Sequence, residues 1–305
     1  MNFIFLDVFC LVFFCGDLCL LPEIENKKNF LQKQLLRLAM DKQCAIAFSG
    51  GLDSRFLAHM AKLVGLKPLL LHAQGPHVPP KESLFAQQWA QENRLCFVPL
   101  VINPLKVPEV AANGRHRCYH CKQLLFSQFL EQAHGLVLFD GTHASDLHTY
   151  RPGMVALKEL GILSPLAEAG LTKAEIRSFA VATGMSFPKQ AARPCLLTRF
   201  AYDLRPDVQS LEALAVAEEQ IEAALQHWAQ SKAIEMPDFR LRVLSGGLEL
   251  HLTAFKTQKT KMSFPNTLHR DLKILVQAIT GKPLTSIHIM SCLSGFFDNK
   301  EGNSQ

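Results

Sequence analysis

The sequence lacks the marks of several protein classes. Its 9 cysteines are an odd number without secreted-domain spacing, which argues against a disulfide framework and favours a reduced, cytoplasmic setting. It has no internal repeat and no low-complexity tract. Charge of one sign does not dominate, because 32 Lys and Arg against 27 Asp and Glu give a net charge of +5. That balance is compatible with phosphorylated small molecules or RNA and is diagnostic of neither.

An unbroken apolar run of membrane-spanning length is absent from the N-terminus. Residues 3–21 are apolar but are interrupted by Asp7, Gly16 and Asp17. No basic residue precedes the run and no small-residue cleavage site follows it, which makes it a poor secretion signal. Two aspartates inside a bilayer are costly. We therefore expect residues 1–25 to be an apolar extension outside the core, and we expect no stable membrane association.

What the sequence does contain is a strong local signal at residues 44–54, CAIAFSGGLDS. An apolar run stops at Ser49, Gly50 and Gly51, and a helical pattern follows Asp53 and Ser54, which predicts a strand, a glycine loop and a helix. Glycines expose backbone N–H groups, the helix start adds its positive dipole end, and serine hydroxyls donate hydrogen bonds. Asp53 is suited to Mg²⁺, which binds through one or two carboxylates and substrate phosphates. The stretch predicts a phosphate-binding loop; the alternative is an ordinary tight turn.

The chain around this loop predicts an α/β fold with a parallel, doubly wound sheet. Strands are expected at 44–48, 67–72, 95–102 and 136–139, separated by helices at 26–40, after the loop, at 81–93 and from Cys118 to about His134. Residues 104–117 are expected to be a loop. Thr172 and Glu175 form a capping box that begins a further helix. Strands alternating with helices are typical of a parallel sheet.

After Tyr202 this alternation stops, and a smaller C-terminal α+β domain is expected. We predict a long helix at 208–228, a hairpin of strands 239–244 and 248–253, a helix at 268–280 and a strand at 286–290. The expected division is an extension at 1–25, an ATP-binding domain at 26–200, a substrate and oligomerisation domain at 201–298 and a frayed tail at 299–305.

Several motifs in order carry a resemblance to a known family. SGGLDS resembles the pyrophosphate loop of the PP-loop ATP pyrophosphatases, which lacks the lysine of a Walker A sequence. The following further stretches make the chain similar to LarE-type ATP-dependent sulfur transferases of nickel-pincer nucleotide biosynthesis: RCYHCK at 117, DGT at 140, YRPG at 150, SPLAEAGLTKAEIR at 164 and PCLLTR at 194. The resemblance covers about 26–200 and continues more weakly through Arg240. It implies a nucleotide-binding fold of the adenine nucleotide alpha hydrolase type.

The resemblance implies an ATP-dependent sulfur transferase that releases AMP and pyrophosphate. Such an enzyme adenylates a carboxylate of pyridinium biscarboxylic acid mononucleotide, and a cysteine attacks the activated acyl group; the matching cysteine is Cys195. Arg193 and Arg199 flank Cys195 and are expected to lower the pKa of its thiol. The implied ATP and Mg²⁺ residues are Ser49, Gly50, Gly51, Asp53 (Mg²⁺), Ser54, Asp140, Gly141, Thr142 and Lys173, and the implied substrate residues are Lys122, Thr198, Arg199, Glu218, Arg240 and Arg242.

The sulfur source has two readings. Cys118 and Cys121 form a CxxC at an expected helix start, and with Cys195 they supply three thiols, enough for three irons of a [4Fe–4S] cluster. A zinc half-site or a redox pair is the alternative for the CxxC alone. If Cys195 donates its own sulfur instead, each chain works once. The ligand count favours the cluster.

Some residues depart from the family pattern. His143 and Ser145 replace an asparagine and an aspartate, Thr198 replaces a serine, and His251 stands where a glutamate is expected. Arg240 and Arg242 alternate on one strand and are expected to face the same side, where guanidinium groups suit a phosphate or carboxylate.

Other functions remain open on this sequence. They are a PP-loop tRNA thiolation enzyme, an amide-forming synthetase, and a nucleotide- or cluster-binding protein without catalysis. The mild charge and the absence of an added basic or zinc-ribbon module argue against RNA. Cys195 has no role in an amide-forming synthetase. We expect a small nucleotide substrate, no nucleic-acid partner, a homo-oligomer and a cytoplasmic location.

Overall fold

The computed structural model describes residues 21–39, 41–147, 152–191, 193–254 and 265–299. Most of the apolar extension, Tyr150 and Arg151 of the YRPG stretch, and the tail after residue 299, for which predictions were made, lie outside these ranges. Within the described residues, no helix combines the length and the apolar character that crossing a membrane requires.

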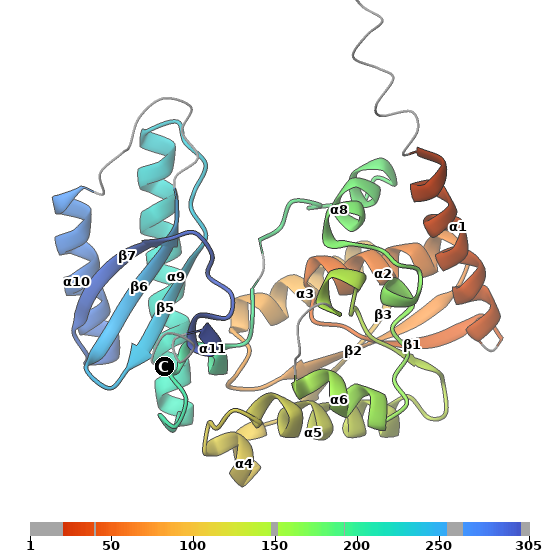
Figure 1. The fold of residues 1–305 in the computed structure, drawn as a ribbon, viewed down its shortest axis with the longest axis horizontal. Coiled ribbons are helices and arrows are strands. Elements are labelled where there is room, and N and C mark those ends of the chain that lie inside the picture. The colour runs from red at the N-terminus through yellow and green to blue at the C-terminus, as the bar shows by residue number, and fades with distance from the viewer. Residues whose placement is uncertain (1–20, 40, 148–151, 192, 255–264, 300–305) are drawn as a thin grey trace, which may run out of the picture.

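The N-terminal part forms a parallel sheet of four strands in the order β3-β2-β1-β4, with helices on both faces (Figure 1). The predicted α/β class is confirmed. In chain order the elements are α1 (Leu21–Leu38), β1 (Gln43–Ala47), α2 (Leu52–Leu63), β2 (Lys67–Gln74), α3 (Pro80–Glu92), β3 (Cys96–Val101), η2 (Pro104–Lys106), α4 (Pro108–Ala111), α5 (Arg117–Gln132), β4 (Leu138–Phe139), η3 (Ala144–Asp146), α6 (Pro152–Glu159), α7 (Pro165–Glu168) and α8 (Lys173–Ala182).

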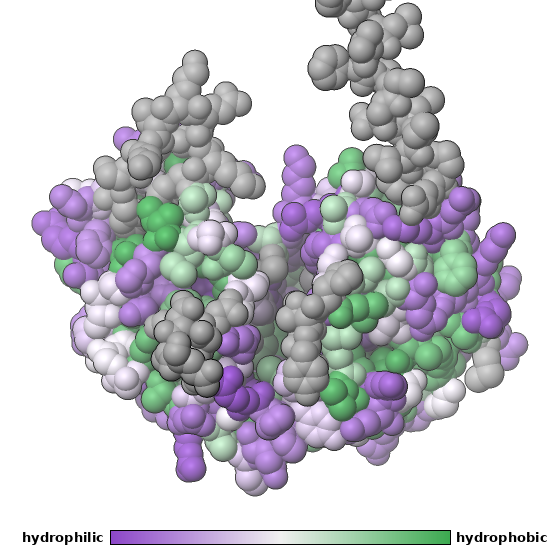
Figure 2. All heavy atoms as spheres, viewed as in Figure 1, coloured by the Kyte–Doolittle hydropathy of each residue, from purple (hydrophilic) through white to green (hydrophobic). Residues whose placement is uncertain are grey.

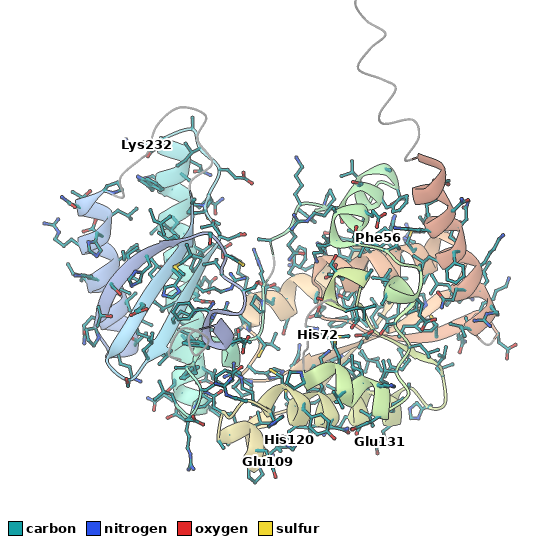
Figure 3. All side chains as sticks on the ribbon, viewed as in Figure 1. Phe56, His72, Glu109, His120, Glu131 and Lys232 are labelled. Atoms are coloured by element: carbon teal, nitrogen blue, oxygen red, sulfur yellow. The ribbon has the colours of Figure 1, made fainter. Side chains whose placement is uncertain are left out.

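Alternation along β1 divides the core of this unit between the two faces of the sheet. Ile46 packs in a cluster with Phe56 of α2 and Phe179 of α8, whereas Ala45 packs in a second cluster with Phe126 of α5. Both faces are covered, as burial of a parallel sheet requires. Figure 1 shows α2 and α8 on one side of the sheet and α5 and α6 on the other. Among the labelled side chains, His72 lies on β2 and His120 on α5 (Figure 3).

The C-terminal part forms a separate mixed sheet of three strands in the order β5-β6-β7. Strands β5 and β6 pair antiparallel, which confirms the predicted hairpin, and β6 pairs parallel with β7. One face packs on α9 and α10 through residues such as Leu241, Leu250 and Val276, and the other face carries polar side chains. Its elements are α9 (Val208–Ser231), β5 (Phe239–Leu244), β6 (Gly247–Thr253), α10 (Asn266–Thr280), β7 (Leu284–Met290) and α11 (Phe296–Asn299).

The segment that joins the two sheets belongs physically to the second core. Leu196 and Phe200 pack with the C-terminal cluster, and Phe200 makes an isolated bridge to Val243 of β5. Cys121 of α5 packs in the same cluster. The PCLLTR motif is therefore held between the two sheets. The domain boundary near residue 201 stays a prediction.

Candidate functional site

The glycine loop lies where the order of strands reverses. The loop follows β1, whose neighbours are β2 on one side and β4 on the other. Ligands of open α/β sheets bind at such a switch point, beyond the carboxyl ends of the strands. Because β1 pairs with β4, the loop lies beside the DGT stretch that follows β4. A Cβ on Gly141 would lie 3.1 Å from the backbone nitrogen of Ser54, so glycine is what allows this close approach.

Within the loop, the hydroxyl groups lie close to exposed backbone. Ser49 Oγ lies 3.2 Å from Ser54 Oγ and accepts a hydrogen bond from the backbone nitrogen of Gly51 at 3.3 Å. Arg55, which is buried, donates from Nε to the carbonyl of Gly50 at 2.9 Å. Its guanidinium also donates to the carbonyl of Ser186 at 2.7 Å. Arg55 therefore fixes the loop to the segment after α8 and does not point to a ligand.

Gly50 is expected to tolerate no side chain. Its φ is +74°, and an added Cβ would lie 2.7 Å from the Cβ of Ala86 on α3. Gly50→Ala is expected to lower the free energy of unfolding by about 2–4 kcal/mol, from left-handed backbone strain together with overpacking. Gly65→Ala is the matched control, because Gly65 has a φ of +83° and, within the part of the chain that the structure describes, its added Cβ would meet nothing within 4 Å beyond its immediate chain neighbours. Urea unfolding should show a clearly smaller loss for the control; equal losses would contradict the close contact with α3.

Asp53 and Lys173 form the charged centre beside the loop. Lys173 Nζ donates to both carboxylate oxygens of Asp53 at 2.6 Å. The capping box predicted at Thr172 and Glu175 is present and begins α8, which presents Lys173 to the loop. A Mg²⁺ on Asp53 would share its carboxylate with this ammonium group. The oxygens are hard ligands of the kind that Mg²⁺ prefers, so the residues fit that ion.

His143 and Ser145, the two residues after DGT that depart from the family pattern, also lie at this centre. His143 Nε2 is 4.0 Å from Asp53 Oδ1 and 3.4 Å from Asp146 Oδ2. Ser145 Oγ accepts a hydrogen bond from the backbone nitrogen of Lys173 at 3.2 Å. Both residues therefore support the Asp53 and Lys173 pair with their own contacts.

Asp140 is buried, and its carboxylate binds neighbouring hydroxyl groups. Ser164 donates to Asp140 Oδ1 at 2.5 Å, and Thr142 donates to the other carboxylate oxygen. Ser164 belongs to the motif that includes Lys173, so Asp140 connects two of the motifs. Its carboxylate accepts from two hydroxyl groups, an arrangement that orders the DGT turn next to the glycine loop.

The CxxC helix and the PCLLTR turn meet through one buried arginine. Arg117, the first residue of α5, donates to the side chain of Asn113 and to the carbonyl of Phe200 at 3.3 Å. Asn113 Nδ2 donates to the carbonyl of Ala201 at 2.7 Å. The guanidinium of Arg117 also stacks on Tyr202, 4.9 Å from the ring centroid. These contacts fix the helix that carries Cys118 and Cys121 against the segment that follows Cys195.

The three thiols lie within electrostatic range of one another. Burial raises the pKa of Cys195 above its ordinary value, and Cys118 adds to the effect. Burial likewise raises the pKa of Cys121, with further contributions from Cys195 and Cys118. Cys118 is exposed, Cys195 is half-buried and Cys121 is buried. Thiols that disfavour one another's charge fit a shared positive group, such as iron.

The expectation that flanking arginines lower the pKa of Cys195 is wrong in its net sign. Arg199 and Arg117 do favour the thiolate, as does a hydrogen bond from the backbone N–H of Leu197, but burial outweighs them. Arg193 instead pairs with Glu82 and, at 3.3 Å, with Glu222. Arg193 is only two residues from Cys195 in the sequence, but its guanidinium pairs with these glutamates.

A pocket of about 560 Å³ lies between the two units, next to the PCLLTR turn. Pro194 and Arg199 line it from the turn, Glu82 from α3, Glu218 from α9 and Arg240 from β5. Figure 2 shows the hollow between the two units on the viewed face. Sequence reasoning did not predict this pocket, because its walls come from segments more than 100 residues apart.

The predicted substrate residues divide into pocket walls and supports. Arg199 forms a two-point ion pair with Glu218, at 2.7 and 2.9 Å. Arg242 is buried and donates to the carbonyls of Thr198 and Leu293. Arg240 lines the pocket and Arg242 does not, although both lie on the same face of β5.

Two other predicted substrate residues also lie near the turn or the CxxC helix. The Thr198 hydroxyl donates to the carbonyl of Cys195 at 2.7 Å. Lys122 packs on α6, where a Cβ on Gly153 would lie 2.9 Å from its Cδ. Gly153 is thus the residue of the YRPG stretch that lets α6 approach the CxxC helix.

Comparisons with known proteins find relatives of this chain. No family model matches the chain. The chain is 35% identical over 200 residues to the uncharacterized protein slr1717 of Synechocystis sp., covering 64% of the chain and 72% of that protein. The chain belongs to the same family as slr1717.

Two further relatives are more distant. The uncharacterized protein MJ0830 of Methanocaldococcus jannaschii is 26% identical over 226 residues, covering 72% of the chain and 82% of that protein. The pyridinium-3,5-bisthiocarboxylic acid mononucleotide synthase of Lactiplantibacillus plantarum is 26% identical over 166 residues, covering 53% of the chain and 60% of that protein. This third likeness agrees with the LarE-type resemblance of the motifs.

Proposed function

We propose that this protein is an ATP-dependent sulfur transferase that converts a carboxylate of pyridinium biscarboxylic acid mononucleotide to a thiocarboxylate. The observation that carries the proposal is the position of Cys195. Its neighbours Pro194 and Arg199 line the pocket between the units, and its thiol lies within electrostatic range of Cys118 and Cys121. The distant likeness to a synthase of the bisthiocarboxylic acid mononucleotide supports the same reaction type.

The glycine loop is the proposed site of the ATP phosphates. Backbone N–H groups at a helix start and the hydroxyls of Ser49 and Ser54 offer donors to phosphate oxygens. Lys173 and an Asp53-bound Mg²⁺ would offset the charge that develops on the departing pyrophosphate. The substrate carboxylate attacks the α-phosphorus, pyrophosphate leaves, and an acyl-adenylate forms.

Arg199 and Arg240 line the pocket and supply guanidinium groups for an anionic substrate, alongside acidic lining residues such as Glu218, which pairs with Arg199. Burial lowers the pKa of Arg240 to about 10, and the charge of Arg199 adds to the effect. Burial also lowers the pKa of Arg242, which lies beside Arg240 on β5 but outside the pocket lining, to about 10, with Arg199 and Arg240 as further causes. Like charges held together out of water are stabilised by an anion, and guanidinium groups match phosphate and carboxylate.

The sulfur-transfer step follows from adenylation. The thiolate of Cys195 attacks the acyl carbon and AMP leaves, which gives a thioester. If Cys195 is the donor, loss of its Cα proton and cleavage of its Cβ–Sγ bond leave the sulfur on the product and dehydroalanine in the chain. Cys118, Cys121 and Cys195 would alternatively hold a [4Fe–4S] cluster, which supplies an open iron for sulfide. The closeness of Cys118 to Cys121 and Cys195, which contributes to the raised pKa values of those two thiols, supports this alternative.

Release of pyrophosphate tests the proposal against its rivals. Full-length protein is incubated with ATP and Mg²⁺, alone or with the pyridinium mononucleotide, tRNA or ammonia plus a carboxylic acid. Pyrophosphate release that depends on the pyridinium mononucleotide is expected. Release that depends on tRNA or ammonia instead, or ATP binding without release under every condition, would refute the proposed reaction. The cytoplasmic location and the homo-oligomer stay predictions.

Arg240 and Arg242 are expected to differ in their effects. Arg240→Ala should weaken the binding free energy of the mononucleotide by about 1.5–3 kcal/mol, since it removes a charged donor from the pocket. The KM for the mononucleotide should rise accordingly. Arg242→Ala should mainly lower the free energy of unfolding, because Arg242 holds the carbonyls of Thr198 and Leu293. Steady-state kinetics and urea unfolding of both variants measure this, with KM for ATP as the internal control. A parallel rise in KM for ATP in Arg240→Ala would place this arginine elsewhere.

A further inference from the structure

The polar face of the C-terminal sheet carries a cluster that the proposed sulfur transfer does not use. Glu249 and His251 lie two residues apart on β6, and His251 is paired with His288 on β7. Because side chains alternate along a strand, these three side chains lie on the same face. One ligand atom from each, the Glu249 carboxylate and an imidazole nitrogen of each histidine, lies within 4.8 Å of the other two.

The distances within the cluster approach those of a metal site. Glu249 Oε2 lies 3.0 Å from His251 Nε2 and 3.8 Å from His288 Nε2. Tetrahedral zinc with bonds near 2.0–2.1 Å separates its ligand atoms by roughly 3.3 Å. Shifts of about 0.3–0.5 Å would bring the Glu249 carboxylate to this spacing from each imidazole, and the two imidazole nitrogens lie within 4.8 Å of one another.

His251 offers its ring to a metal from a buried position, since the residue is 1% exposed. Imidazole nitrogen is a common zinc ligand. Among the described residues, the buried Nδ1 of His251 finds no hydrogen-bond partner, and its Nε2 lies on the side of Glu249, at 3.0 Å from the carboxylate. The Phe296 ring packs edge-to-face on the imidazole, with 4.3 Å between the two ring centroids, and shields the imidazole from water.

The charges around the cluster limit how tightly a cation binds. Arg242 is paired with Glu249 and Arg240 with His251 across β5 and β6. Arg242 works against a cation, although its guanidinium is held by backbone carbonyls and lies 5.4 Å and 5.3 Å from the Phe296 and Phe297 ring centroids. Two imidazoles and one carboxylate select a borderline transition metal over Ca²⁺ or Mg²⁺, which prefer all-oxygen ligands.

We propose that Glu249, His251 and His288 bind one divalent transition-metal ion of the zinc class. Three protein ligands leave a fourth position open to water or to a small ligand. The metal would join β6 to β7 beneath α11, which Figure 1 shows beside this sheet. The inference does not depend on the proposed sulfur transfer, since none of its ligands lines the pocket at the PCLLTR turn.

Zinc titration of the full chain tests the site. Because cysteine thiolates such as those of Cys118, Cys121 and Cys195 are also zinc ligands by type, titrations against a competing chromophoric chelator use both the native chain and one with Cys118→Ser, Cys121→Ser and Cys195→Ser. One Zn²⁺ per chain is expected to remain after these three thiols are replaced. In that background Co²⁺ should absorb without the thiolate charge-transfer band.

His288→Ala is the main variant, because the side chain of His288 is 47% exposed and its loss spares the core. The variant is expected to lower zinc affinity at least about tenfold, as even outer-shell changes often do. Glu249→Gln should give a similar loss, and His227→Ala, an exposed histidine on α9, should give none. Unfolding curves check that each variant is folded. No bound zinc in the background with the three serine substitutions, or unchanged affinity in His288→Ala, would overturn the proposal.

Discussion

Asp53→Ala is expected to lower the rate of AMP and pyrophosphate formation at least about 100-fold, as loss of one preorganised electrostatic group in an active site does. Asp53 follows the glycine loop, and Lys173 Nζ contacts both of its carboxylate oxygens at 2.6 Å. Removal of the carboxylate leaves no hard ligand for Mg²⁺ at that position and frees the ammonium group. The measurement is AMP formed from ATP at saturating mononucleotide, with the free energy of unfolding determined in parallel.

Asp271→Ala is the control for this variant, since Asp271 is an exposed acidic residue on α10. The control should form AMP at the native rate. If Asp53→Ala also cleaved ATP normally, the glycine loop would not be the ATP site, and the proposed function would lose its first step.

Cys195→Ala is expected to abolish thiocarboxylate formation while a first round of adenylation survives. Loss of the attacking nucleophile typically costs at least about 10³-fold in rate. ATP binding should be unaffected, because the glycine loop is built from other strands and helices. Single-turnover reactions with product detection by mass spectrometry would separate adenylation from sulfur transfer.

Cys96→Ala is the matched control, because Cys96 is a free, exposed cysteine on β3 far from the motifs in sequence. It should transfer sulfur at the native rate. Thiocarboxylate made by Cys195→Ala at an undiminished rate would mean that the donor is elsewhere in the chain or in solution.

Elements with strong local signals were predictable from the sequence. The strand, loop and helix at residues 43–63 follow from one apolar run, two glycines and one helical pattern. The capping box at Thr172 and the hairpin of β5 and β6 were predicted from short motifs and are confirmed. In each case the determining interactions lie within a few residues of one another.

Short helices were missed, and their signal was in the sequence. Residues 104–117 were predicted as a loop but contain η2 and α4, and the helices α6 and α7 were not predicted. Each of these four elements begins with a proline: Pro104, Pro108, Pro152 and Pro165. Proline at the first helical position costs no hydrogen bond and presets φ, so it is a start signal as well as a breaker. The strand predicted at 136–139 is shorter in the structure, only Leu138–Phe139.

The site depends on long-range contacts that no local pattern encodes. Arg117 joins α5 to Phe200, a contact between residues 83 positions apart. The motif at 117 gave no indication that its arginine is a buried support. Asn113 adopts a φ of +56° and binds the carbonyls of Ala201 and Leu204, which only the folded chain reveals. The net sign of the Cys195 pKa shift is likewise a consequence of burial, which depends on packing of both units.

The proposed function requires one chain to couple ATP cleavage to sulfur transfer onto a pyridinium carboxylate. Mass spectrometry of a single reaction mixture tests this coupling. Anaerobically reconstituted protein is incubated with ATP, Mg²⁺ and the mononucleotide, and the small molecules and the Cys195 peptide are measured together. We expect AMP, pyrophosphate and a product in which one carboxylate oxygen is replaced by sulfur, with Cys195 either intact or converted to dehydroalanine. AMP and pyrophosphate without any sulfur-containing product would contradict it.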